Sequence, residues 1–139
     1  MPRWMKRSFM ILGIILLLWL IMAQSCMKMR ISDSKAKEQF LQAGVELQTP
    51  VKMINGFPLH YAKTGSDTLP TLLFVHGTPG SWNAFDAYLK NKELLQHFRI
   101  ISIDRPGFGY SDFGNAMNLS AQTEIIAAWM DSINNNKPF

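Results

Sequence analysis

Residues 71–80 read Thr-Leu-Leu-Phe-Val-His-Gly-Thr-Pro-Gly. Residues 71–75 form a short continuous apolar run, which is typical of a strand buried on both faces of a parallel sheet. Glycine and proline then end the strand, because neither residue favours regular structure. The same pattern returns at residues 99–104, a strand-like run followed by the turn Arg-Pro-Gly-Phe-Gly at 105–109. The chain therefore holds two predicted strands, each followed by a glycine-rich turn.

Two further strand-like runs, residues 51–54 and 57–62, lie upstream and are joined by Asn55-Gly56. This dipeptide is the strongest short signal for a β-hairpin. Because Pro58 has no N–H to donate to a neighbouring strand, we expect the hairpin at an edge of the sheet.

Two amphipathic helices are predicted between and after the turns. The first begins at Ser81, a residue type that caps helices, and runs to about Lys90. Its expected inner face consists of Trp82, Phe85, Tyr88 and Leu89. The second opens at Ser120 and carries one apolar stripe, formed by Ile125, Ile126, Trp129, Met130 and Ile133. Strands and helices that alternate at this spacing predict an α/β fold with a parallel sheet behind an antiparallel hairpin.

Loops that follow the carboxyl ends of parallel strands line the ligand crevice of such a sheet. The first, residues 76–81, reads His-Gly-Thr-Pro-Gly-Ser and resembles the oxyanion loop of α/β-hydrolases, His-Gly-x-Pro. The second, residues 104–112, resembles the turn after the next strand in the epoxide hydrolase, haloalkane dehalogenase, proline iminopeptidase and carbon–carbon hydrolase branch. The resemblance covers roughly residues 51–139. It implies a partial α/β-hydrolase fold, a small-molecule substrate, and no cofactor or metal.

The resemblance also implies roles for individual residues. Acyl transfer builds negative charge on a carbonyl oxygen, and backbone N–H groups aimed at that oxygen stabilise it. The N–H of Thr78 is one such donor by resemblance, while Gly77 allows the sharp turn and Pro79 fixes its exit. Pro79 and Phe108 are expected to face the substrate. His76 is expected to brace the loop through hydrogen bonds rather than to act as the catalytic base.

Other polar residues are interpreted as structural. Asp104 stands at a strand end where a nucleophile could sit, but in the resembled family this position holds the turn below it. His60 and His97 belong to no motif, so we expect ordinary surface or strand-end histidines. The glycine spacing matches neither Gly-x-Gly-x-x-Gly nor the lysine-bearing phosphate loop, which argues against a nucleotide site.

The family nucleophile sits on a Gly-x-Ser-x-Gly elbow, or an Asp equivalent, after a strand that should begin around residues 137–139. The 139 residues contain no such elbow. The usual acid, base and second oxyanion donor would also follow it. We therefore expect a domain truncated before the elbow, and a chain that is catalytically inactive on its own.

The N-terminal segment is apolar and preceded by bases. Residues 8–27 carry no charge and follow Arg3, Lys6 and Arg7. This pattern predicts a signal peptide or membrane anchor, with the membrane contacted through residues 8–27.

The fate of this segment stays open between three alternatives. Residues 23–25, Ala-Gln-Ser, place small residues where a signal peptidase cuts, which would give a secreted protein. A cut before Cys26 resembles a bacterial lipoprotein signal with a lipidated thiol, although Ala23 stands where leucine is usual. The segment could also remain as an uncleaved anchor. Each alternative places the rest of the chain on the periplasmic or exterior side of the membrane.

Charge divides the chain in the same way. Residues 1–30 hold five of the 14 Lys and Arg and no acid, whereas residues 31–139 hold nine bases against ten acids. The folded part therefore lacks the basic surface of a nucleic-acid-binding protein. We expect a signal or anchor over 1–27, a connector with one short helix over 28–50, and the domain portion over 51–139.

The sequence thus predicts the N-terminal part of a membrane-anchored or exported α/β-hydrolase. A Ser nucleophile in the complete protein would imply ester, peptide or carbon–carbon cleavage, and an Asp nucleophile epoxide or carbon–halogen chemistry. The alternative is a non-enzymatic membrane-tethered fragment or interaction module.

Overall fold

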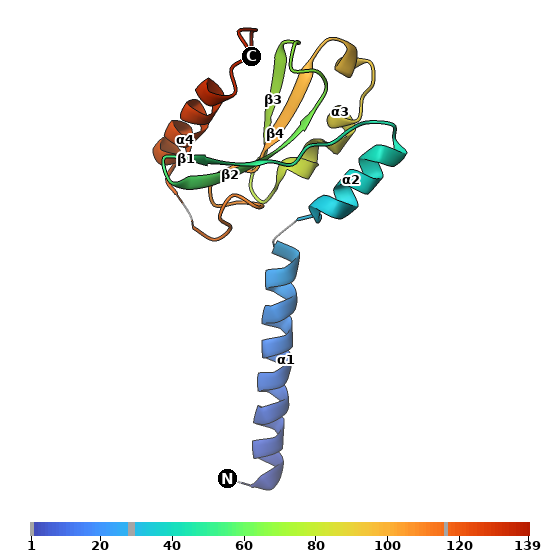
Figure 1. The fold of residues 1–139 in the computed structure, drawn as a ribbon. Coiled ribbons are helices and arrows are strands. Elements are labelled where there is room, and N and C mark those ends of the chain that lie inside the picture. Colours follow the sequence, from blue (N-terminus) through green and yellow to red (C-terminus); the bar gives the residue numbers. More distant parts are fainter. Residues whose placement is uncertain (1, 28–29, 116) are drawn as a thin grey trace.

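The computed structural model describes residues 2–27, 30–115 and 117–139. Along the chain it contains helices α1 (Arg3–Met27) and α2 (Asp33–Gln42), strands β1 (Val51–Ile54), β2 (Phe57–Thr64) and β3 (Thr71–Val75), the 3₁₀ helix η1 (Trp82–Phe85), helix α3 (Asp86–Leu89), the 3₁₀ helix η2 (Leu94–Gln96), strand β4 (Arg99–Ile103) and helix α4 (Leu119–Ser132). Helix α1 projects away from the part of the chain that holds the sheet (Figure 1).

The four strands form one mixed sheet in the order β1-β2-β4-β3. Strands β3 and β4 are parallel, and the β1–β2 hairpin adds to β4 antiparallel. Asn55 and Gly56 both have positive φ angles, 51° and 81°, as a two-residue hairpin turn requires. The predicted α/β class and the edge position of the hairpin are therefore confirmed.

Helices cover both faces of the sheet. Strand β4 is buried along its whole length, and its side chains alternate between two hydrophobic clusters because successive residues of a strand point to opposite faces. Ile100 packs with Ala36, Phe40, Trp82 and Leu89 from α2, η1 and α3. On the other face, Ile101 and Ile103 pack with Leu59, Tyr61, Ile125 and Trp129, the last two from α4. The predicted apolar stripe of α4 is confirmed.

The helix boundaries needed correction. Helix α4 begins before Ser120, because Asn118 is its N-cap and its side-chain oxygen accepts a hydrogen bond from Ala121 N–H. The segment after Ser81 is a 3₁₀ turn followed by a one-turn α-helix rather than one continuous helix. Tyr88 is 49% exposed, so its assignment to the inner face was wrong, although its ring lies 5.0 Å from that of Phe74.

The segment between α1 and β1 contains the one short helix that we expected. Helix α2 ends at Gln42, close to Gly44, whose φ angle is +70°. Its Ala36 and Phe40 are fully buried. The connector therefore contributes directly to the core of the sheet-bearing part.

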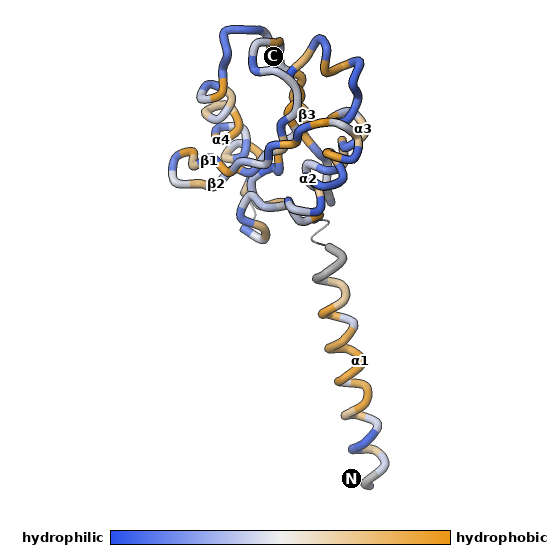
Figure 2. Tube along the Cα trace, turned by 45° about the vertical axis from the view of Figure 1, so that its right-hand side comes forward, coloured by the Kyte–Doolittle hydropathy of each residue, from blue (hydrophilic) through white to orange (hydrophobic). Residues whose placement is uncertain are grey.

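Helix α1 is apolar along most of its length (Figure 2). Residues Trp4–Ala23 form a stretch of 20 residues that is long and apolar enough to cross a membrane, judged by length and composition. At 1.5 Å per residue such a stretch spans about 30 Å, the thickness of a bilayer's hydrocarbon core. The predicted lipidation of Cys26 concerns a side chain that lies outside the described part of the structure.

Candidate active site

The two glycine-rich loops start side by side. Strands β3 and β4 are parallel neighbours, and their last residues, Val75 and Ile103, are partners in the register. Residues 76–81 and 104–111 therefore leave the same carboxyl edge of the sheet, which is where parallel sheets place their ligand sites.

His76 joins the two loops. Its side chain is 2% exposed; Nε2 accepts a hydrogen bond from Arg105 N–H at 3.1 Å, and Nδ1 lies 2.7 Å from Gly77 O. A ring that accepts at Nε2 and donates at Nδ1 is neutral. Burial lowers the pKa of His76, and the hydrogen bond to the Gly77 carbonyl opposes that shift without reversing it. The geometry agrees with the bracing role that we proposed from the sequence.

The loop tip lies open. Gly77, Thr78 and Pro79 are exposed, and Thr78 Oγ1 accepts a hydrogen bond from Arg105 Nη2 at 3.0 Å. Among the contacts of the described residues, the Thr78 N–H has no acceptor. A backbone N–H held on a braced loop and left open is what an oxyanion donor requires.

The reason given for Gly77 was wrong. A Cβ added at Gly77 would meet nothing within 4 Å, so the turn itself does not require glycine there. Gly80 is the constrained position, since an added Cβ would lie 2.9 Å from His76 Nδ1 and 3.2 Å from Gly77 O. Close packing of the His76 ring beneath the loop explains this difference.

Asp104 supports both loops from below. Its carboxylate is completely buried and accepts hydrogen bonds from Trp82 N–H at 2.7 Å and Tyr110 N–H at 2.9 Å. Gly109, with φ at +51°, passes so close that an added Cβ would collide with this carboxylate. Asp104 has no open side toward a substrate, so it is placed to hold the turn rather than to attack.

His60 was misjudged from the sequence. It is 1% exposed, and its Nδ1 lies 2.8 Å from Asp104 Oδ2. Its backbone N–H donates to Ser111 Oγ, and its Nε2 lies 3.7 Å from Asp33 Oδ1. His60 is therefore the buried partner of Asp104, not a surface or strand-end histidine. His97, in contrast, is exposed as expected.

Arg105 was missed as a site residue. Its guanidinium carbon lies 4.5 Å from the centroid of the Phe108 ring, and that ring lies 5.4 Å from His76. Arg105 therefore links Thr78 at the loop tip to Phe108 in the second loop. The sequence placed Arg105 within the motif but gave no sign that its side chain reaches back to the first loop. Substrate contacts of Phe108 and Pro79 remain predictions.

Two cavities in the described part of the chain are lined by residues outside the two glycine-rich loops. One of about 370 Å³ is lined by residues that include Gly44, Lys63 and Lys92. Another of about 330 Å³ is lined by residues that include Arg99 and Asn135. Within the described residues, no three His, Cys, Asp or Glu side chains are placed to share a metal ion.

Comparison with known proteins places this arrangement in a family. Residues 70–138 match the sequence profile of the alpha/beta hydrolase fold family. The chain carries the N-terminal portion of an α/β-hydrolase.

Relatives share short stretches with it. Epoxide hydrolase 1 of Caenorhabditis elegans is 43% identical over 54 residues, which are 39% of this chain and 13% of that protein. Epoxide hydrolase 3 of Mus musculus is 36% identical over 63 residues, 45% of this chain and 16% of the relative. The matched stretch thus spans less than a fifth of either curated relative.

Solved structures share the fold. The crystal structure of a bacterial membrane phospholipase A superposes with a TM-score of 0.62 at 21% identity, covering 91% of this chain and 41% of that one. The epoxide hydrolase VrEH1 of Vigna radiata gives a TM-score of 0.52 at 24% identity, covering 63% and 28%.

Proposed function

We propose that this chain is the N-terminal part of a membrane-anchored or exported hydrolase, whose complete form cleaves ester, amide, epoxide or related bonds with a nucleophile, an acid and a histidine. The observation that carries the proposal is the open N–H of Thr78 on a loop braced by His76, beside a turn held by Asp104. The family match and the epoxide hydrolase relatives support hydrolysis as the reaction class.

The contribution of this part to the reaction is electrostatic. When a nucleophile attacks a carbonyl or opens an epoxide, negative charge collects on one oxygen. An N–H that is already aimed at this oxygen stabilises the charge without reorganising, and one such donor contributes about 3–4 kcal/mol. The Thr78 N–H is the donor that we assign. His76 and Asp104 fix its position through buried hydrogen bonds.

Ser and Asp nucleophiles both fit this part. The relatives by sequence are epoxide hydrolases, and one structural neighbour is a phospholipase. The Thr78 loop would serve the oxyanion of an ester and the alkoxide of an opened epoxide alike. Because the 139 residues hold no nucleophile elbow, we propose that they are inactive alone.

A non-enzymatic, membrane-tethered module is the second candidate. If the protein is such a module, it binds a partner, and neither the 139-residue chain nor a longer product hydrolyses a substrate.

The test begins with the coding sequence that follows the codon for Phe139, read in three frames for Gly-x-Ser-x-Gly or its Asp form within about a dozen codons. The product that contains the elbow is assayed with p-nitrophenyl esters and styrene oxide, and the 139-residue chain is assayed beside it. We expect turnover of at least one substrate class by the longer product and none by the shorter.

A matched pair of variants in the longer product tests the assigned donor. Thr78→Pro removes the N–H and should lower kcat by about 10²–10³-fold, whereas Thr78→Ala removes only the hydroxyl and should cost far less. Equal activity of the two variants, or esterase activity of the 139-residue chain alone, would refute the proposal.

A further inference from the structure

The segment that follows α1 lies on the second active-site loop. Arg30 places its guanidinium carbon 4.8 Å from the centroid of the Tyr110 ring and 5.4 Å from that of Phe113. Tyr110 Oη donates to Ile31 O at 3.2 Å. Both aromatic residues belong to the turn that leaves the carboxyl end of β4, so the chain enters the fold directly at the active-site edge.

A second set of contacts holds this entry point in place. Thr49 Oγ1 donates to Asp33 Oδ2 at 2.8 Å, and Asp33 Oδ1 lies 3.7 Å from Nε2 of the buried His60. His60 in turn contacts Asp104, and the centroid of its ring lies 5.1 Å from that of Tyr110. The start of α2 is therefore tied to the same buried pair that supports the active-site loops.

Chain length then limits how far the end of α1 can be from these loops. Met27 and Arg30 are three peptide steps apart, so their Cα atoms lie within about 11 Å whatever the path between them. The apolar stretch ends at Ala23, four helical residues earlier, which adds about 6 Å. Lipidation of Cys26 would bring a membrane at least as close. Figure 1 shows α1 meeting the sheet-bearing part on the side opposite the C terminus.

The side chains on this edge suit a membrane surface. Phe113 is 39% exposed, and Leu119 at the start of α4 is 73% exposed. Arg30 supplies positive charge beside Phe113. Aromatic and apolar side chains favour the headgroup region of a bilayer, and basic side chains are attracted to anionic lipids.

We propose that this edge, residues 105–115 and 117–119 together with Arg30, rests on the headgroup region of the bilayer that holds the N-terminal segment. The inference depends on the membrane anchoring in the proposed function and adds the orientation of the site. The loop that carries Thr78 then opens beside the lipid, and a substrate with a hydrocarbon chain reaches it from the bilayer rather than from open water.

Depth-dependent quenching tests this orientation with the full 139-residue chain. Single cysteines replace Asn115, which is exposed on this edge, or Ser120, which is exposed and directly follows it. Each variant also carries Cys26→Ser, is labelled with bimane and is reconstituted in phosphatidylcholine–phosphatidylglycerol vesicles. Lipids with a nitroxide on the headgroup should lower the fluorescence of both labels about twofold or more, since the labels would lie at the interface.

Two control positions make each outcome informative. Lys137→Cys lies by the amino end of β3, a strand about 17 Å long, and its label should keep its intensity. Leu16→Cys reports insertion of α1, because a nitroxide deep in the acyl chains should quench it. Quenching at Leu16 without quenching at Asn115 and Ser120 overturns the orientation alone. Absence of quenching at Leu16 overturns anchoring through the N-terminal apolar segment, and with it the orientation that rests on it.

Discussion

The two ends of the β3–β4 pair each carry a network of polar side chains, but the networks differ in burial and in what they hold. At the carboxyl end, Asp104 and His60 are 0% and 1% exposed and contact each other. Asp104 accepts hydrogen bonds from the backbone N–H groups of Trp82 and Tyr110. The loop tip above them, including Thr78, is exposed.

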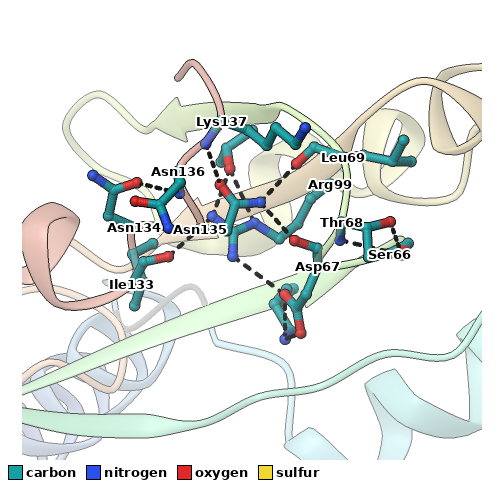
Figure 3. Close-up of polar contacts among 12 residues, drawn as sticks. Ser66, Asp67, Thr68, Leu69, Arg99, Ile133, Asn134, Asn135, Asn136 and Lys137 are labelled. Atoms are coloured by element: carbon teal, nitrogen blue, oxygen red, sulfur yellow. Dashed lines mark hydrogen bonds and ion pairs between the residues drawn. The ribbon is translucent and has the colours of Figure 1, made fainter.

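The amino end is held together by side chains that reach carbonyl groups (Figure 3). Arg99 donates to Thr71 Oγ1, Asp67 Oδ1 and Ile133 O, and Asn135 Nδ2 donates to the carbonyls of Asp67 and Leu69. Asp67 itself is 61% exposed and also accepts from Lys63. This network closes the loops onto each other.

The network around Asp104 supports loops from beneath, whereas the network around Arg99 ties loops to each other. A buried carboxylate that uses its oxygens on loop amides fixes a backbone conformation while leaving the outer surface of the loop available. A half-exposed ion pair that ties loops together contributes to stability alone. The predictions that follow measure how much each end contributes.

Removing Asp104 should have the largest effect. Asp104→Ala leaves His60 and two backbone N–H groups buried without their acceptor, so the free energy of unfolding should fall by about 3–5 kcal/mol. Urea unfolding of the full chain in detergent micelles measures this loss. Glu124→Ala, which removes an exposed carboxylate on α4, should change stability by less than about 0.5 kcal/mol. Similar losses in the two variants would show that Asp104 is not the main support.

Arg99→Met should come second. The methionine keeps most of the buried apolar stem of a residue that is 4% exposed, but the hydrogen bonds to Thr71, Asp67 and Ile133 are lost. We expect a loss of about 2–3 kcal/mol, smaller than for Asp104 because water can solvate Asp67. The same unfolding assay applies, with Lys92→Met as the exposed control. A loss greater than that of Asp104→Ala would reverse the comparison.

His76→Gln should cost about 1–2 kcal/mol at neutral pH, because the acceptor for Arg105 N–H is displaced. The pKa of His76 is lowered by burial, so the unfolded chain binds a proton more readily than the folded chain. The stabilisation is therefore complete above about pH 6.5 and is lost as the pH falls through the lowered folded pKa. Unfolding of both proteins at pH 7.5 and pH 5 should show the gap between them narrowing in acid; a gap that widens in acid contradicts the assigned ring state.

Asp67→Asn should have the smallest effect, below about 1 kcal/mol, since the carboxylate is mostly exposed. Its pKa is lowered, chiefly by the hydrogen bond from Lys63. A depressed carboxyl pKa stabilises the fold above about pH 4 and ceases to do so as the pH falls through the folded value. Wild type and variant should thus unfold alike at pH 2.5, and high salt should reduce their difference at pH 7.

The sequence predicted the elements that depend on local chemistry. Asn55-Gly56 fixed the hairpin, Pro58 indicated the edge, and the apolar runs marked β3 and β4, because these signals act within a few residues. The prediction that a helix begins at Ser120 was wrong, because Asn118 caps the helix and α4 begins at Leu119.

The support of the site could not be predicted in the same way. His60, Asp33 and Arg105 meet their partners across 44, 27 and 27 residues of chain, in the pairs His60–Asp104, Asp33–His60 and Arg105–Thr78. Such pairs depend on strand register and helix placement, which no local pattern encodes. Gly77 and Gly80 stand in the same motif, but only Gly80 leaves no room for a Cβ, because the His76 ring packs beneath the backbone there.

Amide hydrogen exchange of the full chain, resolved by residue, tests most directly whether a rigid support presents an open donor. The account predicts that the Thr78 amide exchanges at close to the unprotected rate, while the amides of Trp82 and Tyr110, bonded to Asp104, exchange at least about 100-fold more slowly. Protection at Thr78, or exchange of all three amides at one fast rate, would contradict it.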